Sequence, residues 1–563
     1  MADNHHVTDF KVVFLPEVEI DNSLQDSELR FTAVLEKLYE RHRSVRDAGF
    51  NGDAYKPGLD AMLSYCEFLG HPERQFRSIH VAGTNGKGSV CSMLAAALAA
   101  RGLRVGLYTS PHLVDFRERI KIIGWPEAPL PSGELRFAHP SQPRGWAPPV
   151  HVATGGYGSP EGVALPAAAM IPAACNADTG GIGGNAPRPL GVQGDDSFEM
   201  IPKESVCEFM QKFDREGLTF FEVTTGMAFW WFAQQKVDVA VIETGLGGRL
   251  DSTNVIKPEL AVITSIGLDH CDLLGSTRAE IAAEKAGIFK PGVPALVWGR
   301  DPETQPIFER IAAAVGAPLH FAEDLPLPSE AADLPESIDS AGKALAPGNR
   351  SRPWLREREG PNRKVGRDER SEVLPGPVPL RLDLAGPCQD INLRTVLAAL
   401  NILGVTDYAV LRAIANAARI TGFRGRWETL LSDPLTICDI GHNPPAMEAN
   451  CRKIEQLRAA SVAGGHAPLL FVYGAMADKD VDSIKQYLPK DAEYYLVQPE
   501  TPRALPLPDL ALKLKSLNTI AAGSVKQGVC QALGRARELP GSIVFIGGST
   551  FVVSEAITYI ESL

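Results

Sequence analysis

Short apolar runs alternate with longer amphipathic runs through much of the chain. Buried or half-buried strands are predicted where aliphatic and β-branched residues cluster, at Phe76–Ile79, Val105–Tyr108, Phe116–Ile123, Val237–Ile242, Leu260–Ile266 and Pro294–Trp298. Helices are predicted at Glu28–Arg43, Ala61–Leu69, Cys91–Ala100, Pro202–Phe213, Met227–Phe232 and Arg278–Ala286. Strands that alternate with helices are typical of a parallel sheet covered by helices, so this region predicts an α/β domain.

A second pattern of strands and helices begins after two further predicted helices, Asn392–Leu403 and Tyr408–Ile420. Its predicted elements are Leu435–Ile440, Pro445–Leu457, Leu469–Tyr473, Tyr494–Val497, Asn518–Ala521 and Ser542–Ile546. Gly422 and Gly425 precede this pattern and suit a hinge. We therefore predict an extension over residues 1–24, a first domain over 25–422 and a smaller α/β domain over 423–563.

Two stretches lack any helical or strand period, at about 125–197 and 325–377. The first is dense in proline and glycine, and the second contains the very polar run SRPWLREREGPNRKVGRDERSE. Such segments bury too little apolar surface to offset the entropy of ordering them. We expect both to be irregular surface insertions in the first domain.

Composition narrows the class of protein. The 563 residues are 44% hydrophobic and 22% charged, which is ordinary for a soluble protein. A net charge of −12 argues against nucleic acid or an anionic membrane as the main partner. No signal peptide or membrane-spanning run is recognisable, and the nine cysteines form no CxxC pair. We expect a cytoplasmic protein that acts as a monomer.

The segment His80–Val90, HVAGTNGKGSV, lies between a predicted strand and a predicted helix. Its glycines let the backbone approach a polyphosphate, and the first free amides of the helix point at phosphate oxygens. Lys87 supplies a positive charge and Ser89 a hydroxyl for phosphate or magnesium. A plain glycine-rich connector is the alternative, but the lysine, the hydroxyl and the flanking elements favour a nucleotide site. The usual pattern is GxxxxGK[ST], whereas here Gly88 stands between lysine and serine.

Polar residues follow three of the predicted strands of the first domain. Ser110, Glu243 and His270 each lie at or just beyond a strand's carboxyl end, where an open α/β sheet lines its ligand crevice. A carboxylate beside glycines in such a place suits a magnesium ligand or a water-orienting acid. Ordinary turn chemistry at Ser110, a solvated Glu243 and a loop role for His270 are the alternatives. Their shared position at one sheet edge favours the metal site.

Several motifs together resemble one family, the folylpolyglutamate synthase and dihydrofolate synthase branch of the Mur-type ATP-dependent ligases. They are HVAGTNGKGSV, LYTSPHLVDFRERI, LTFFEVTTGMAFWWF, VAVIETGLGGRLDSTNV, ITSIGLDHCDLLGSTRAEIAAEKAGIFK, FRGRWE and ICDIGHNPPA, in family order. The resemblance implies a central domain like that of P-loop NTPases and a smaller Rossmann-like domain.

The resemblance also implies site residues. ATP phosphates would be held by Gly83, Thr84, Asn85, Gly86, Lys87, Gly88 and Ser89, and the nucleotide would be contacted by Asn392, Arg426 and Asp439. Mg²⁺, in two ions, would be bound by Ser110, Glu243 and His270, with Lys285 where the family has a carbamylated lysine. The pterin substrate would contact Lys56, Pro57, Gly58, Leu59, Thr219, Phe220, Phe221, Glu222 and Asp251, and the glutamate and acyl phosphate would meet near His442 and Asn443.

The implied reaction is ATP-dependent addition of L-glutamate to dihydropteroate, to folates, or to both, through an acyl phosphate. Lys87, Glu243, His270, Lys285 and His442 are the expected catalytic residues. The segment GGRLDSTN is closer to the bifunctional bacterial form. Two alternatives are a nucleotide-dependent regulatory protein that has lost the chemistry, and a Mur ligase that acts on a cell-wall nucleotide peptide. The insertions leave the first alternative open, whereas TSPHL and FFEVTT argue against the second.

Overall fold

The structure is a computed structural model that describes residues 27–42, 58–124, 197–325, 382–405, 408–461 and 466–563. The predicted extension over 1–24 lies outside the described residues, as do Lys56 and Pro57. So do the two predicted insertions, apart from Ser197 and Leu325.

An eight-stranded sheet organises the first part of the chain, in the order β4-β3-β2-β5-β1-β6-β7-β8. The six strands from β2 to β8 in this order run parallel, and at one edge β3 pairs antiparallel with both β2 and β4. The strands are β1 (Arg77–Ala82), β2 (Val105–Tyr108), β3 (Ile120–Ile123), β4 (Phe198–Met200), β5 (Val239–Glu243), β6 (Leu260–Ile263), β7 (Ala295–Val297) and β8 (Leu319–Phe321).

Alternate residues of the central strands enter two different layers of packing. Val239 and Val241 join the apolar cluster that contains helix α4, whereas Ala240 and Ile242 join the cluster that contains α6. Helix α4 is rich in alanine and buried on all sides, so α11, α12 and α13 can pack closely against it. The helices of this part are α1 (Ser27–Arg41), α3 (Asp60–Phe68), α4 (Lys87–Ala99), α5 (Lys203–Phe213), α6 (Phe220–Gln234), α7 (Cys271–Leu274), α8 (Arg278–Ala286), α9 (Gln305–Val315), α11 (Gln389–Ile402), α12 (Tyr408–Ala415) and α13 (Ala417–Thr421).

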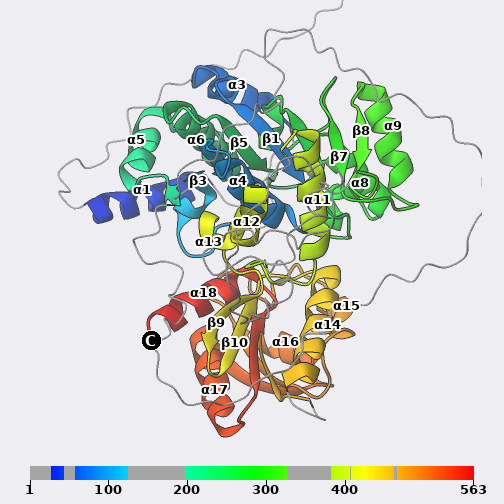
Figure 1. Ribbon diagram of the computed structural model, residues 1–563. Coiled ribbons are helices and arrows are strands. Elements are labelled where there is room, and N and C mark those ends of the chain that lie inside the picture. Colours follow the sequence, from blue (N-terminus) through cyan, green and yellow to red (C-terminus); the bar gives the residue numbers. More distant parts are fainter. Residues whose placement is uncertain (1–26, 43–57, 125–196, 326–381, 406–407, 462–465) are drawn as a thin grey trace, which may run out of the picture.

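A six-stranded sheet organises the rest of the chain, in the order β13-β12-β11-β14-β10-β9, with only β9 antiparallel. One face packs on α14, α15 and α16, and the other on α17 and α18. The elements are β9 (Glu428–Ser432), β10 (Leu435–Asp439), α14 (Pro444–Ser461), β11 (Leu469–Tyr473), α15 (Val481–Lys485), β12 (Glu493–Gln498), α16 (Leu507–Lys513), β13 (Asn518–Ser524), α17 (Val525–Glu538), β14 (Ile543–Gly547) and α18 (Thr550–Glu561). Figure 1 shows the two sheets as separate units, one above the other.

The predicted fold of two α/β units is confirmed by these two sheets. Strand β9 begins at Glu428, and the exact boundary after residue 422 remains a prediction. Among the described residues, no helix combines the length and the apolarity that crossing a bilayer requires.

Two local predictions were wrong. Tyr408–Ile420 is not one helix, because Asn416 interrupts it: its side chain donates to the Arg412 carbonyl (2.9 Å) and α13 starts afresh after it. The first half of Phe116–Ile123 is a 3₁₀ turn, Phe116–Arg119, rather than a strand. Asp115 and Glu118 form a capping box there, and these local hydrogen bonds favour a turn over extended chain.

Candidate active site

The phosphate loop, Gly83–Gly86, joins the carboxyl end of β1 to Lys87, the first residue of α4. Two of its glycines are required by geometry. A Cβ on Gly83 would lie 1.8 Å from Thr264 Oγ1, and a Cβ on Gly86, whose φ is +87°, would lie 2.3 Å from Asn392 Oδ1. The loop therefore packs closely between Thr264, the residue after β6, and Asn392 on α11. The first amides of α4 lie at its end, as in helix-terminal anion sites.

Two lysine ammonium groups share one carbonyl of this loop. Lys87 Nζ donates to the carbonyl oxygens of Gly83 (3.1 Å) and Thr84 (3.3 Å), and Lys285 Nζ donates to that of Gly83 (3.0 Å). Lys285 is buried on α8, and burial together with the nearby Lys87 charge lowers its pKa to about 7. An anion bound at the loop would relieve the repulsion between the two cations.

Glu243 is the last residue of β5, between β1 and β2 in the sheet. Its side chain is buried, and its Oε2 accepts the backbone N–H of Ser110 (3.0 Å), two residues beyond β2. Burial raises the pKa of Glu243, and Lys87 opposes part of that rise. A carboxylate in this position is stabilised in its ionised form by a cation.

His270 follows β6 at the same sheet edge and adopts a left-handed φ of +52°. Burial lowers its pKa to about 3 although Asp269 opposes the change, so the imidazole is neutral and suited to coordinate a metal. Within the described residues, no three His, Cys, Asp or Glu side chains form a ready-made metal cluster. The donor types of Ser110, Glu243 and His270 nevertheless fit a divalent cation completed by phosphate and water oxygens.

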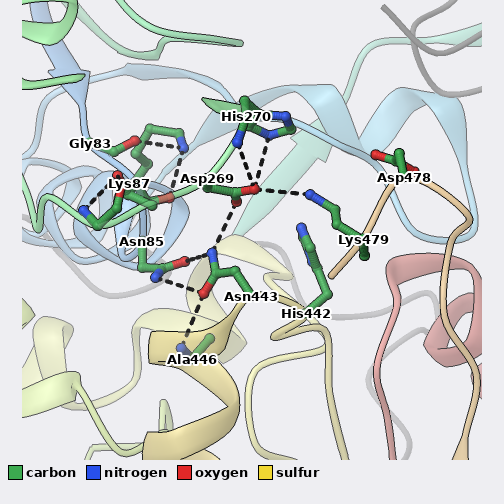
Figure 2. Close-up of polar contacts among 12 residues, drawn as sticks. Gly83, Asn85, Lys87, Asp269, His270, His442, Asn443, Ala446, Asp478 and Lys479 are labelled. Carbon is green, nitrogen blue, oxygen red and sulfur yellow. Dashed lines mark hydrogen bonds and ion pairs between the residues drawn. The ribbon is translucent and has the colours of Figure 1, made fainter. Parts of the chain in front are cut away.

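The second domain reaches this edge through the segments after β10 and β11 (Figure 2). Asn85 and Asn443 exchange two amide hydrogen bonds of 3.2 and 3.1 Å. Asn443 Nδ2 also donates to Asp269 Oδ2 (3.0 Å), and Lys479 Nζ donates to Asp269 Oδ1 (3.0 Å). Burial opposes ionisation of Asp269, but His270 and Lys479 hold its pKa below the usual range. The two domains thus meet at the phosphate loop.

His442 lies on the second-domain side of this contact (Figure 2). Its Nδ1 donates to the Ile440 carbonyl (2.9 Å), which leaves Nε2 as the acceptor nitrogen of the neutral ring. Burial lowers the pKa of His442, and the Lys479 charge lowers it further. The ring is therefore neutral at rest, with Nε2 unprotonated.

Three residues outside the phosphate loop, Asn392, Arg426 and Asp439, were predicted to contact the nucleotide. Asn392 lies against the loop. Its Nδ2 donates to Gln389 Oε1 (3.0 Å), and Gln389 Nε2 donates to Ser89 Oγ (3.2 Å). Arg426 lines the small pocket that also contains Gly88, and its charge lowers the pKa of Glu243. These two residues face the loop from both sides of the domain contact.

Asp439, the third, is engaged within its own domain. Its oxygens accept the backbone N–H groups of Trp427 (3.0 Å) and Gly441 (2.7 Å) and the amide of Asn450 (2.8 Å). In this structure Asp439 fixes the turn that carries His442, and a nucleotide contact remains a prediction.

Several residues predicted to bind the pterin make capping or packing contacts within the first domain. Thr219 and Glu222 form the capping box that starts α6, and Phe220 is buried under the Arg119 guanidinium, 5.2 Å from the ring centre. Phe221 packs against Gly245, where a Cβ would lie 2.5 Å from its ring. Their substrate contacts remain predictions.

Asp251 closes the loop that follows β5. Its carboxylate accepts the backbone N–H groups of Leu246 (2.8 Å) and Thr253 (3.0 Å), and burial raises its pKa. Gly58, with φ +144°, and Leu59 precede α3 at the edge of the described residues. No described contact brings Gly58 or Leu59 to the phosphate loop.

Sequence reasoning missed Asp269 and Lys479 as site residues. Asp269 directly precedes His270, and Lys479 lies in the segment GAMADKD after β11. The signal was available, because polar groups beyond a strand's carboxyl end line the crevice, and this rule, used above for the strands of the first domain, applies equally to β11.

Comparison with known families and proteins agrees with this geometry. The family model of the Mur ligase middle domain matches residues 214–319, and that of the Mur ligase glutamate ligase domain matches residues 425–550. The folylpolyglutamate synthase of Lacticaseibacillus casei is 28% identical over 499 residues, covering 88% of this chain and 92% of that protein. The dihydrofolate synthase/folylpolyglutamate synthase of Bacillus subtilis is 29% identical over 510 residues, covering 89% and 94%.

Solved structures agree as well. E. coli FolC in complex with DHPP and ADP superposes with a TM-score of 0.61 at 25% identity, covering 94% of this chain and 98% of that one. A bifunctional folylpolyglutamate synthase/dihydrofolate synthase with Mn, AMPPNP and L-glutamate bound gives 0.59 at 25% identity, with the same coverage. The two domain matches, the relatives and the superposed structures therefore agree: this chain carries the middle and glutamate ligase domains of Mur ligases, and along nearly its whole length it is similar to folylpolyglutamate and dihydrofolate synthases.

Proposed function

We propose that this protein uses ATP to join L-glutamate to dihydropteroate, to the γ-carboxylate of folates, or to both, and releases ADP and phosphate. The names of its relatives and the ligands in the superposed structures support this assignment. The observation that carries it in this chain is the convergence of Lys87, Glu243 and the Ser110 amide at one end of a phosphate loop.

Phosphoryl transfer from ATP to the substrate carboxylate depends mainly on positioning and electrostatic stabilisation. The amides at the start of α4 would bind the phosphates, and Lys87 would turn from the loop carbonyls to the β and γ phosphates. Ser110, Glu243 and His270 would hold Mg²⁺, which neutralises charge on the transferred phosphoryl group when bound.

The amine of glutamate would then attack the acyl phosphate, forming an amide and releasing phosphate. His442 is the group proposed to take the amine's proton, because its Nδ1 is already committed to the Ile440 carbonyl and its Nε2 can accept one. Asn443 would hold His442 at the phosphate loop through its paired hydrogen bonds with Asn85. Closure of the two domains would keep water from the acyl phosphate.

Lys285 supports a finer proposal, that its amine reacts with CO₂ to form a carbamate that helps to organise a second metal ion. Carbamate formation needs the neutral amine, and a pKa of about 7 leaves roughly half of the groups neutral at pH 7. In ¹³C NMR with labelled bicarbonate, we expect a carbamate resonance that is missing in Lys285→Arg. Its absence from the wild type would refute the carbamate and leave the ligase proposal intact.

We also propose a substrate range, a class of partner, a cellular compartment and an oligomeric state for this protein. The sequence GGRLDSTN and the bifunctional relatives support activity on both dihydropteroate and folates. The acidic charge of −12 supports small molecules rather than nucleic acid or membrane as partners. The eight free cysteines among the described residues support a reducing, cytoplasmic setting. We further propose a monomer, which light scattering on the purified chain tests.

The ligase activity is tested by ADP release. Purified protein is offered ATP and Mg²⁺ with dihydropteroate, tetrahydrofolate or neither, each with and without L-glutamate. We expect sustained ADP release only when an acceptor and glutamate are both present. ADP release that is the same with and without acceptor and glutamate would favour a nucleotide-dependent regulatory protein. ADP release only with a cell-wall nucleotide peptide would favour another Mur ligase.

A further inference from the structure

The backbone of Gly88 does not require glycine. It is the second residue of α4 and is not among the residues with positive φ, and alanine is the better helix former. A Cβ on Gly88 would, however, lie 2.7 and 2.9 Å from the Cζ and Cε2 atoms of Phe423. Its next neighbour, Glu243 Oε2, would be at an ordinary 3.7 Å. The space beside Gly88 is therefore filled by the ring of Phe423.

Phe423 belongs to the linker between α13 and β9. Its backbone N–H donates to the Ala418 carbonyl (3.0 Å), so its backbone is fixed to the end of α13. Its ring packs against the apolar cluster that surrounds α4. The segment that leads into the second domain thus rests directly on the helix that follows the phosphate loop.

Lys121 fixes the same linker from the sheet side. It lies buried on β3, and its Nζ donates to the carbonyl oxygens of Thr421 (2.8 Å) and Gly422 (2.9 Å). Gly422 has φ +58°, and a Cβ there would lie 2.5 Å from the ring of Phe198 on β4. The linker backbone is therefore held between a buried ammonium and an aromatic ring.

Beyond Phe423 the linker enters the second domain and contacts the segment that follows Ser110. A Cβ on Gly425 would lie 2.7 Å from Leu113 Cδ1, and Leu113 is buried in the core cluster of the second domain. Ser554 on α18 also donates to the Leu113 carbonyl. One continuous set of contacts therefore runs from the phosphate-loop helix through Phe423 to the second domain.

From these contacts we propose that Phe423 is a positioning residue, seated on Gly88 and carried by a linker whose preceding carbonyl groups are held by Lys121. It makes the orientation of the second domain depend on the state of the phosphate loop. The glycine between lysine and serine in GKGS is present to admit this ring, not to admit the nucleotide. The tests of this inference that measure turnover rest on the proposed ligase function. Those that measure nucleotide binding or domain orientation do not.

The first test separates nucleotide binding from turnover. Phe423→Ala should bind AMPPNP with a Kd within about threefold of wild type and lose at least about tenfold in kcat, whereas Phe423→Leu should recover most of the turnover. Lys121→Met should behave like Phe423→Ala, with Lys121→Arg as its conservative partner. Equal losses in AMPPNP affinity and kcat, or no recovery in Phe423→Leu, would contradict the proposal.

The sharper test is a double-mutant cycle. Gly88→Ala alone should lower kcat strongly, because its methyl group collides with the Phe423 ring. Adding Gly88→Ala to Phe423→Ala should cost no more than about twofold further, because the ring is gone. If the two losses multiply instead, the methyl group obstructs the nucleotide itself and the proposal fails.

Domain orientation can be followed without any ligase activity. Dyes at the exposed residues Glu309 and Lys490 report the distance between the two domains by energy transfer. AMPPNP should change the transfer efficiency of wild type and leave that of Phe423→Ala unchanged, although both proteins bind the nucleotide. No change in wild type, or a full change in Phe423→Ala, would overturn the coupling. A wild type that responds here but makes no amide bond would refute only the proposed function.

Discussion

At the scale of single residues, the candidate site differs from an ordinary strand end because its ionisable side chains are buried and have shifted pKa values. Glu243 is enclosed and has a raised pKa, whereas Lys285 is enclosed and has a lowered one. Both sit beside Lys87, so each charge depends on what binds at the phosphate loop. Such perturbed groups are characteristic of functional sites.

Glu243→Gln keeps the size of the side chain and removes the charge proposed to hold Mg²⁺. We expect kcat for ADP release to fall by about 10² to 10³, the loss typical of removing one electrostatic stabiliser. Steady-state kinetics measures the fall, with a substitution at the acid just before β6, Glu259→Gln, as the control. A Glu243→Gln enzyme with normal turnover would remove Glu243 from the mechanism.

Lys285 gives a pH dependence of stability with a defined sign. Its folded pKa of about 7 lies below the ordinary lysine value of 10.5, so between these pH values the unfolded chain binds a proton that the folded chain lacks. Relative to Lys285→Met, wild type should therefore gain stability as pH rises above about 7, by at most ~1.4 kcal/mol per pH unit. Chemical denaturation at pH 7, 8 and 9 in CO₂-free buffer measures the difference, and a constant difference would contradict the buried, neutral lysine.

A site role for a single residue was predictable from sequence only when the residue stood in a recognisable motif. Lys87 and Glu243 stand in glycine-rich strand-end motifs, and the structure brings them together. Asp269 and Lys479 are 210 positions apart and meet only because the two domains touch, so nothing local to either residue indicates the pair.

At the scale of elements, hydrophobic pattern located most strands and helices, and capping decided their ends. Helix α6 was expected to begin at Met227 but begins at Phe220, because Thr219 and Glu222 form a capping box that the apolar pattern does not reveal. Helix α4 likewise begins at Lys87 rather than at Cys91. The irregular insertions at about 125–197 and 325–377 stay a prediction, because apart from Ser197 and Leu325 they lie outside the described residues.

The capping box predicts a stability effect. Thr219→Ala should lower the free energy of unfolding by about 1 kcal/mol, because the Glu222 backbone N–H loses its acceptor. Thr219→Ser keeps the hydroxyl and should remain close to wild type. Denaturant titration of the three proteins measures this, and equal stability of Thr219→Ala and wild type would show that the cap is dispensable.

At the scale of the whole molecule, the site exists only where the two α/β units meet. The Asn85–Asn443 amide pair and the Asp269–Lys479 ion pair join the phosphate loop and the segment after β6 to the second domain. Each unit was predictable by itself from its strand and helix pattern. Their contact was expected only from the family resemblance, which placed Arg426, His442 and Asn443 beside the nucleotide and the acyl phosphate, because docking depends on the three-dimensional structure rather than on local pattern.

The ion pair predicts a defect in turnover without a defect in nucleotide binding. Lys479→Met leaves Asp269 partly buried without its ammonium partner, so closure of the domains becomes less favourable. We expect kcat to fall about tenfold while the Kd for AMPPNP changes little. Lys490→Met, an exposed lysine of the same domain, is the matched control. Similar kinetics for the two variants would mean that the Asp269–Lys479 pair does not matter to the reaction.

The central claim is that this contact between domains brings a substrate carboxylate to the ATP phosphates and converts it to an acyl phosphate. Dihydropteroate or folate labelled with ¹⁸O in the reacting carboxylate tests this directly, with ATP and glutamate present and the released phosphate analysed by mass spectrometry. We predict one ¹⁸O atom in each phosphate released. Amide product accompanied by unlabelled phosphate would contradict it.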